Sequence, residues 1–320
     1  MVLVVGQNST WQKTYQITTL NRGGVNRVQH VFSSAAGKGS NACRVLRLYD
    51  IEHELHAYIG GPDGHKFKAD CDADGIVSRF TLIDGETRIC VTLLEDDRCM
   101  TEIVEPAPPI TPAERKAFHE GFLEHINHAR ILAIQGTAMT GENDECFREF
   151  TQAAKARGVA VILDSYRTHG RLALEAAPEI LKINQDELAE LTGLPVESLE
   201  ERKAAYRHVR ERFGVSWVII TRGAEGAEGS NGTLTVRSGA ASVQPVNPIG
   251  SGDSVTAGIV ATISRDGRPF DELKNDGELF RRAVVEGVVA GTANCLSLKP
   301  GEILPDDMAT VRSSAWVQEV

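Results

Sequence analysis

The sequence predicts an α/β fold in which a mostly parallel central sheet is covered by helices on both faces. Short apolar runs typical of buried parallel strands recur along the chain, and longer segments with helical apolar spacing lie between them. The length of 320 residues suits one large α/β domain spanning residues 1–320, and such a chain can bury a substantial core.

The expected strands and helices alternate in chain order. Strands are predicted at Leu3–Val5, Ile131–Ile134, Val159–Leu163, Ile180–Ile183 and Trp217–Thr221. Helices are predicted at Ala113–His128, Asp144–Arg157 and Leu199–Phe213, and the tail after Leu304 is expected to be a final helix or a loose end.

Two regions break this alternation. Thr14–Ser34 alternates through Val25, Arg27, Gln29 and Val31, and Thr87–Val104 alternates around an acidic turn. Both patterns predict antiparallel strands, which we expect to pair into a small lid sheet built from residues of about 10–34 and 87–106. The alternative is that they form edge hairpins of the main sheet.

Composition excludes several classes of function. With 42% hydrophobic and 24% charged residues the chain is an ordinary globular protein, and its net charge of -10 argues against nucleic-acid binding. Six cysteines lack Cys-x-x-Cys spacing and a zinc pattern, which favours idle thiols in a reducing cytosol. The N-terminus lacks the basic lead of a signal peptide and no run is long enough to span a membrane, so a cytoplasmic protein is expected.

The most informative segment is Asn247–Ser254, which reads Asn-Pro-Ile-Gly-Ser-Gly-Asp-Ser before an apolar helical stretch. Glycines let the backbone approach a ligand, and the free N–H groups of a helix start attract an anion. Asp253 there would repel a phosphate, unless it takes the proton from a hydroxyl that attacks the phosphate. This pattern indicates a kinase with an anion hole and a general base, whereas the alternative is that Asp253 is only an N-cap.

Three further segments suggest ligand contacts. Ala35–Asn41 carries a lysine between two glycines before a helix, without the spacing of a P-loop. Asn184 and Glu187, three residues apart, could hold a hydrated Mg²⁺ or could simply form a capping box. Thr221–Ala227 is glycine-rich and follows a strand, where open sheets bind ligands, although it also suits a plain hairpin loop.

Taken together, these four segments resemble the PfkB (ribokinase-like) carbohydrate kinases over nearly the whole chain and in the same order. The resemblance implies a three-layer α/β/α ribokinase-like domain with a lid, ATP as phosphoryl donor with Mg²⁺, and a homodimer formed through the lid sheets. The branch similar to 1-phosphofructokinase and tagatose-6-phosphate kinase fits best, with Arg27 and Arg88 holding a substrate phosphate.

The motifs and the resemblance together assign a set of site residues. Asp253 would be the base, with Gly250, Ser251 and Gly252 forming the anion hole. Substrate contacts are expected from Gln12, Arg27, Gly37, Lys38, Gly39, Asn41, Arg88 and Thr137. Nucleotide contacts are expected from Lys182, Asn184, Thr221, Gly223, Gly226 and Asn294, and a water-mediated metal site from Asn184 and Glu187.

The sugar-recognition end departs from the family pattern, because Gln12 stands where that branch has an aspartate that binds sugar hydroxyls. This leaves two alternatives open: a kinase for an unphosphorylated sugar or nucleoside, and a catalytically silent sensor of phosphosugars. A Rossmann dehydrogenase is disfavoured, since no Gly-x-Gly-x-x-Gly follows the first strand.

Overall fold

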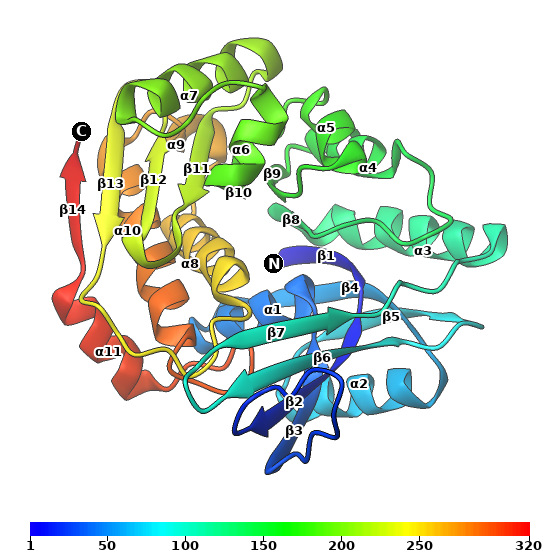
Figure 1. The fold of residues 1–320 in the computed structure, drawn as a ribbon. Helices are drawn as coiled ribbons and strands as arrows, with labels where there is room; N and C mark the ends of the chain where they lie inside the picture. The colour runs from blue at the N-terminus through cyan, green and yellow to red at the C-terminus, as the bar shows by residue number, and fades with distance from the viewer.

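The computed structural model describes residues 1–320 and contains a ten-stranded main sheet (Figure 1). Its order is β14-β13-β12-β11-β10-β9-β8-β1-β4-β5. The seven strands from β11 to β5 in that order are parallel, and the last three at the other edge are antiparallel. The parallel strands are β1 (Val2–Asn8), β4 (His53–Gly60), β5 (Ser78–Ile83), β8 (Ile131–Gln135), β9 (Ala160–Asp164), β10 (Ile180–Asn184) and β11 (Trp217–Thr221). The antiparallel edge comprises β12 (Ala227–Ser230), β13 (Thr235–Gly239) and β14 (Trp316–Glu319).

Helices cover both faces of the main sheet, as the apolar runs predict. In β1, Val2 and Val4 face one core whereas Leu3 and Val5 face the other, because successive side chains of a strand point to opposite faces. The first core is closed by α1 (Lys38–Leu48), α2 (Gly61–Ala73), α8 (Ser251–Asp266), α9 (Phe270–Leu273), α10 (Gly277–Asn294) and α11 (Pro305–Ser314). The second is closed by α3 (Pro112–His125) with the 3₁₀ turn η1 (Ile126–His128), α4 (Cys146–Lys155), α5 (Thr168–Leu174), α6 (Gln185–Thr192) and α7 (Leu199–Phe213).

Local sequence signals set where the helices begin and end. At α7, Ser198 and Glu201 form a capping box, and Gly214 ends the helix in the left-handed conformation. At α3, Thr111 and Glu114 form a second capping box. The predicted bounds of α7 and β11 match the structure to the residue.

A separate four-stranded sheet, here called the small sheet, has the order β3-β2-β6-β7. It is built from β2 (Thr10–Ile17), β3 (His30–Ala36), β6 (Arg88–Glu95) and β7 (Met100–Val104). The predicted α/β fold with an additional small sheet is therefore confirmed, and the alternative of edge hairpins on the main sheet is wrong.

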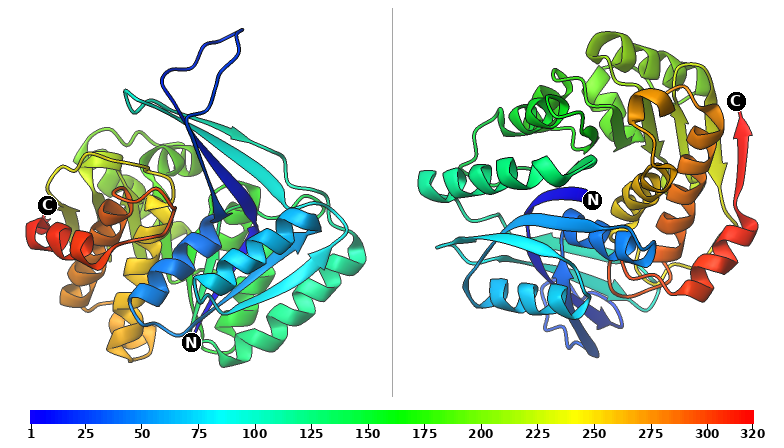
Figure 2. Two further views of the ribbon diagram at one scale, coloured as in Figure 1. Left: turned by 90° about the horizontal axis from the view of Figure 1, so that it is seen from below. Right: turned by 180° about the vertical axis from the view of Figure 1, so that it is seen from behind.

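Three details of the sequence prediction are wrong. The alternating residues Val25, Arg27 and Gln29 lie in an exposed loop between β2 and β3, and Figure 2 shows this dark blue hairpin projecting from the body. The two hairpins of the small sheet join through a parallel pair, β2 with β6, rather than an antiparallel one. The tail continues beyond α11 as β14, which pairs with β13 at the edge of the main sheet.

No helix combines the length and the apolar composition that a membrane span requires.

Candidate active site

The start of α8 lies at the centre of the candidate site. Gly250 is the N-cap residue and no side chain caps this helix. The N–H groups of Gly250, Gly252 and Asp253 donate to no other backbone group, whereas the N–H of Ser251 donates to the Pro248 carbonyl at 3.2 Å. Unpaired N–H groups at a helix start favour an anion. Ser251 therefore differs from its two glycine neighbours, because its N–H already has an acceptor.

Asp253 is buried, with 6% of its surface exposed, and its carboxylate accepts a hydrogen bond from Asn41 Nδ2 at 2.9 Å. The capping interpretation of Asp253 is wrong, because the N-cap is Gly250 and the Asp253 side chain bonds to α1 instead. Burial raises the pKa of Asp253, and the neighbouring Asp164 carboxylate adds to the rise, while Lys38 opposes it.

Asp164, the last residue of β9, holds two lysines beside Asp253. Its carboxylate oxygens lie 2.6 Å from Lys38 Nζ and 2.9 Å from Lys182 Nζ, and one of them accepts a hydrogen bond from Thr256 in α8. Burial opposes ionisation of Asp164, but the two lysines outweigh it and lower its pKa to about 2. Burial would likewise lower the pKa of Lys38, but Asp164 and Asp253 hold it above its ordinary value. Lys38 is thus fixed as a cation beside Asp253.

A cavity of about 250 Å³ lies between the small sheet and the carboxyl ends of the parallel strands. It brings together most of the residues expected to bind substrate, and Asp253 opens into it. Those residues are Gln12, Gly37, Lys38, Asn41, Arg88 and Thr137.

Gly37 is required at the edge of this cavity by backbone geometry. Its φ is 115°, a conformation that other residues rarely adopt, and a Cβ there would lie 2.7 Å from the Asn8 carbonyl. The loop can therefore turn from β3 into α1 and bring Lys38 to Asp164.

Two residues expected to bind substrate lie elsewhere in this chain. Gly39 faces the core rather than the cavity, because a Cβ there would meet Leu55 at 2.7 Å and Gly6 at 3.0 Å, so its role is close packing of α1 on β1. Arg27 lies in the exposed loop between β2 and β3 and does not line the cavity of its own chain.

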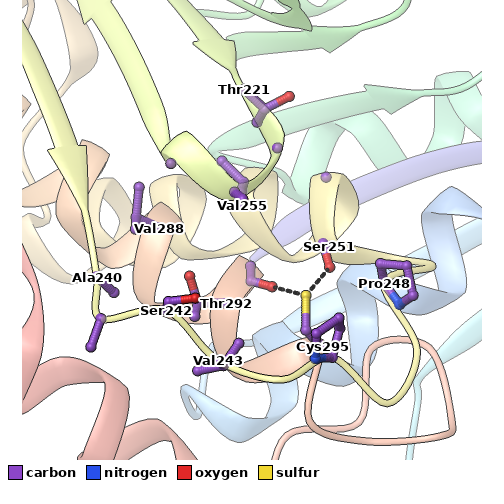
Figure 3. A pocket seen from close by; sticks show the side chains of 17 residues that line it. Thr221, Ala240, Ser242, Val243, Pro248, Ser251, Val255, Val288, Thr292 and Cys295 are labelled. Carbon is purple, nitrogen blue, oxygen red and sulfur yellow. Dashed lines mark hydrogen bonds between the residues drawn. The ribbon is translucent and has the colours of Figure 1, made fainter. Parts of the chain in front are cut away.

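A second cavity, of about 380 Å³, lies on the other side of the α8 start (Figure 3). Thr221, Gly223 and Gly226 line it, as the sequence predicts for a nucleotide loop, although this loop is also the hairpin that joins β11 to β12 through the 3₁₀ turn η2 (Gly223–Glu225). Its other walls are largely apolar and come from the 240–245 segment, α8 and α10, namely Ala240, Ala241, Val243, Pro245, Val255 and Val288. Figure 3 shows Cys295 hydrogen-bonded to Ser251 at its rim, with 3.2 Å between Sγ and Oγ.

The two cavities share the α8 start. Ser251 and Gly252 line the second cavity, whereas Ile249 and Asp253 line the first. Lys182 stands behind this junction, since a Cβ on Gly252 would lie 3.0 Å from its Nζ.

Asn294 does not reach the second cavity. Its side chain is fully buried, and both ends of the amide are hydrogen-bonded within the protein. It donates to the Ile249 carbonyl and to Ser251 Oγ and accepts from the Gly301 N–H. It therefore braces the loop that leads into α8.

Asn184 and Glu187 form the capping box that was the alternative to a metal site. Asn184 Oδ1 accepts from the Glu187 N–H at 2.8 Å, and Glu187 Oε2 accepts from the Asn184 N–H at 2.9 Å. No group of three acidic, histidine or cysteine side chains is arranged to ligate a metal directly. The second Glu187 oxygen remains for water, and the Glu187 charge contributes to the raised pKa of Lys38, so Glu187 lies near the site.

Three residues of the site received no role from the sequence. Asp164 and Gln135 are the last residues of β9 and β8, paired side by side in register, and Glu102 of β7 lines the first cavity. Their common signal is a polar residue that ends a strand or faces inward from one, but that signal recurs at many positions that bind nothing.

Comparison with known proteins adds a family and a fold. Residues 1–302 match the model described as pfkB family carbohydrate kinase. Three solved structures illustrate the similarity. A putative phosphofructokinase from Staphylococcus aureus is 24% identical over 100% of this chain and 99% of its own, with a TM-score of 0.78. Phosphofructokinase-2 from Escherichia coli, in complex with potassium, is 19% identical over 98% of both chains, with a TM-score of 0.86. A possible 1-phosphofructokinase from Thermotoga maritima is 17% identical over 100% of this chain and 99% of its own, with a TM-score of 0.84.

Proposed function

The chain belongs to the pfkB family of carbohydrate kinases, and from this premise we propose that it transfers the γ-phosphoryl group of ATP to a hydroxyl of a sugar phosphate. One observation carries the proposal: the start of α8 separates two cavities, with unpaired N–H groups on it and Asp253 beside them. A phosphoryl group held at that junction is in reach of both a donor and an acceptor.

In this mechanism Asp253 accepts the proton of the attacking hydroxyl. Its buried position and its raised pKa both make it a better base than a solvated aspartate, and Asn41 holds the carboxylate in place. The N–H groups of Gly250 and Gly252 stabilise the charge on the transferred group, and the Lys38 ammonium adds a nearby positive charge.

The second cavity is proposed to bind ATP. Its apolar walls suit an adenine ring, and its polar end opens at the helix start where phosphates bind well. Mg²⁺ would neutralise phosphate charge there. The donor set fits a hydrated ion held through water by Glu187 with Asn184 nearby, since the capping box leaves one carboxylate oxygen free.

The first cavity is proposed to bind the sugar phosphate, with the small sheet as its lid. Arg88 lines it and is aimed by a hydrogen bond from Nε to Thr10 Oγ1 at 2.9 Å. Arg88 and Lys38 give the cavity two cations for a phosphate. Glu102 in the same cavity favours the alternative, a kinase for an unphosphorylated sugar, because its negative charge opposes a phosphate.

The direct test combines an acceptor panel with one substitution. The wild-type protein with Mg-ATP should phosphorylate fructose 1-phosphate, fructose 6-phosphate or tagatose 6-phosphate faster than the free sugars. Asp253→Asn should lower kcat by about 10²–10⁴-fold and leave ATP affinity nearly unchanged. The control is Asp266→Asn at the far end of the same helix, which should keep full activity.

The outcomes separate the candidates. Faster turnover of a free sugar or nucleoside would select the unphosphorylated acceptor, and binding of sugar phosphates without any turnover would select a silent sensor. Equal activity of Asp253→Asn and wild type would remove Asp253 as the base.

A further inference from the structure

Two buried glutamines lie at or near the ends of neighbouring strands, and they differ in their hydrogen bonding. Gln7, fully buried near the end of β1, is bonded at both ends of its amide: Nε2 donates to Glu142 at 3.1 Å, and Oε1 accepts from the Met139 N–H at 2.9 Å. Gln135, which ends β8, is 2% exposed, and its Oε1 is buried without any partner. Polar groups buried in proteins nearly always have a hydrogen-bond partner, so an amide without one indicates that a ligand supplies the missing partner.

The unpaired amide faces the first cavity. Gln135 is among the residues that line it, together with Asp253 and Arg88. The next residue, Gly136, lies against the Lys38 side chain, since a Cβ at this position would lie 3.6 Å from Lys38 Cδ. Gln135 therefore belongs to the floor of the cavity, close to the proposed base.

The opposite wall carries an acceptor that is open to solvent. Glu102 on β7 lines the mouth of the cavity and forms no ion pair. The small-sheet residue that faces the same space from β2, Gln12, has its amide nitrogen committed to Thr92 Oγ1 at 2.7 Å. Free hydrogen-bonding capacity in this cavity thus remains at Gln135 Oε1 and at the Glu102 carboxylate, and Asn8 Oδ1, which also lines the cavity, is a further buried oxygen without a partner.

We propose that Gln135, with Glu102 across the cavity, recognises the hydroxyl groups of the sugar. This inference rests on the proposed function and names the residues that select the acceptor. An amide offers one acceptor oxygen and two donor hydrogens, and a carboxylate offers only acceptors, so the pair suits vicinal hydroxyls rather than a second phosphate. Recognition by a fixed, unpaired amide is selective, because a substrate that lacks the matching hydroxyl leaves the amide unpaired.

Gln135→Met tests the proposal with Gln7→Met as the matched control, since methionine has the same length and no hydrogen-bonding amide. Gln135→Met should raise the KM for the sugar phosphate by on the order of 10-fold, with kcat and the KM for ATP within about 2-fold of wild type. The melting temperature of the ligand-free protein should stay the same or rise, because an unpaired buried amide has been removed. Gln7→Met should lower that temperature, because it leaves Glu142 and the Met139 N–H short of a partner.

The inference is overturned if Gln135→Met lowers the ligand-free melting temperature as much as Gln7→Met does, or if it keeps the wild-type KM. It is also overturned if no sugar phosphate of the panel stabilises the wild-type protein against heat. Stabilisation by a sugar phosphate without phosphoryl transfer would overturn the proposed kinase function alone. In that case, loss of the stabilisation in Gln135→Met would still support recognition by Gln135.

Glu102→Gln extends the test across the cavity. It should raise the KM for the same sugar phosphate and spare the KM for ATP, and an unchanged KM for the sugar phosphate would remove Glu102 from the recognition pair.

Discussion

Asp164 makes the acid stability of the fold depend on one buried carboxylate. Its pKa falls from 3.8 to about 2 in the folded chain because Lys182 and Lys38 stabilise the ionised form. A depressed carboxyl pKa stabilises the folded state above the unfolded pKa, and that contribution of about 2 kcal/mol is lost as the pH falls from about 4 to about 2. The raised pKa of Asp253 has the opposite sign, since its protonated form is favoured by folding.

Asp164→Asn should therefore lower the free energy of unfolding at pH 7 by about 3–5 kcal/mol, because Lys38 and Lys182 lose their buried counter-charge. The measurement is urea unfolding between pH 2 and 7, in which the variant should show a shallower decline below about pH 4 than wild type. Asp72→Asn, which breaks an exposed pair with Lys68, is the control and should change stability by less than about 1 kcal/mol. A variant that declines as steeply as wild type would show that Asp164 does not control acid stability.

At the scale of elements, the site depends on how closely α8 packs on α10. A Cβ on Gly258 would lie 2.5 Å from the Glu286 carbonyl oxygen and 2.9 Å from Gly287 Cα, so the two backbones touch at this point. Two helices can approach each other this closely only where the residues at their crossing point are small. This contact helps to fix the position of the α8 start, and with it Asp253, relative to the two cavities.

Gly258→Ala should lower the melting temperature, since overpacking against backbone costs about 1–3 kcal/mol and outweighs the better helix propensity of alanine. Gly121→Ala in α3 is the matched control. Its added Cβ would meet a side chain rather than backbone, the His56 ring at 3.1 Å, so a smaller displacement is needed there than at Gly258. Thermal unfolding of both variants should show a clear loss for the first and little change for the second, and equal losses would contradict the packing argument.

The elements also show how far the sequence alone could lead. Strands β8, β9 and β11 are predictable because apolar runs report burial directly, and Asp253 is predictable because a glycine pair precedes it at a helix start. The alternation at Val25, Arg27 and Gln29 predicts a strand wrongly, since period-two spacing in an exposed loop has no partner strand to bury one face. The roles of Gln135 and Asp164 depend on which strands become neighbours, and that is a property of the tertiary fold.

On the scale of the whole molecule, the outer face of the small sheet is apolar and uncovered. Val31 lies opposite Tyr15, which lies opposite Leu93, so these three side chains share one face, and Ile103 joins it opposite Val91. Val31 is 60% exposed and Ile103 is 56% exposed. α2 packs against β2 and β3 near their base, where Asp70 accepts from the Ala35 N–H, but the outer part of the face has no such cover, as the view from below in Figure 2 shows.

We propose that a second copy of the chain covers this face, so that the small sheets of two protomers meet. An apolar face of this kind favours a partner that removes it from water, and a lid held between two chains closes the first cavity of each chain more firmly than a free sheet.

The double variant Val31→Glu with Ile103→Glu should convert a wild-type dimer to a monomer, because two carboxylates per chain would be buried against apolar partners. Light scattering after gel filtration gives the mass directly. The control, Val77→Glu with Leu123→Glu, adds the same charges at exposed positions outside the small sheet and should remain dimeric. A monomeric wild type, or a double variant that stays dimeric, would rule out the sheet-to-sheet contact. If the contact holds, the monomeric variant should also show a larger rise in the KM for the sugar phosphate than in the KM for ATP, because the inner face of the small sheet lines the first cavity.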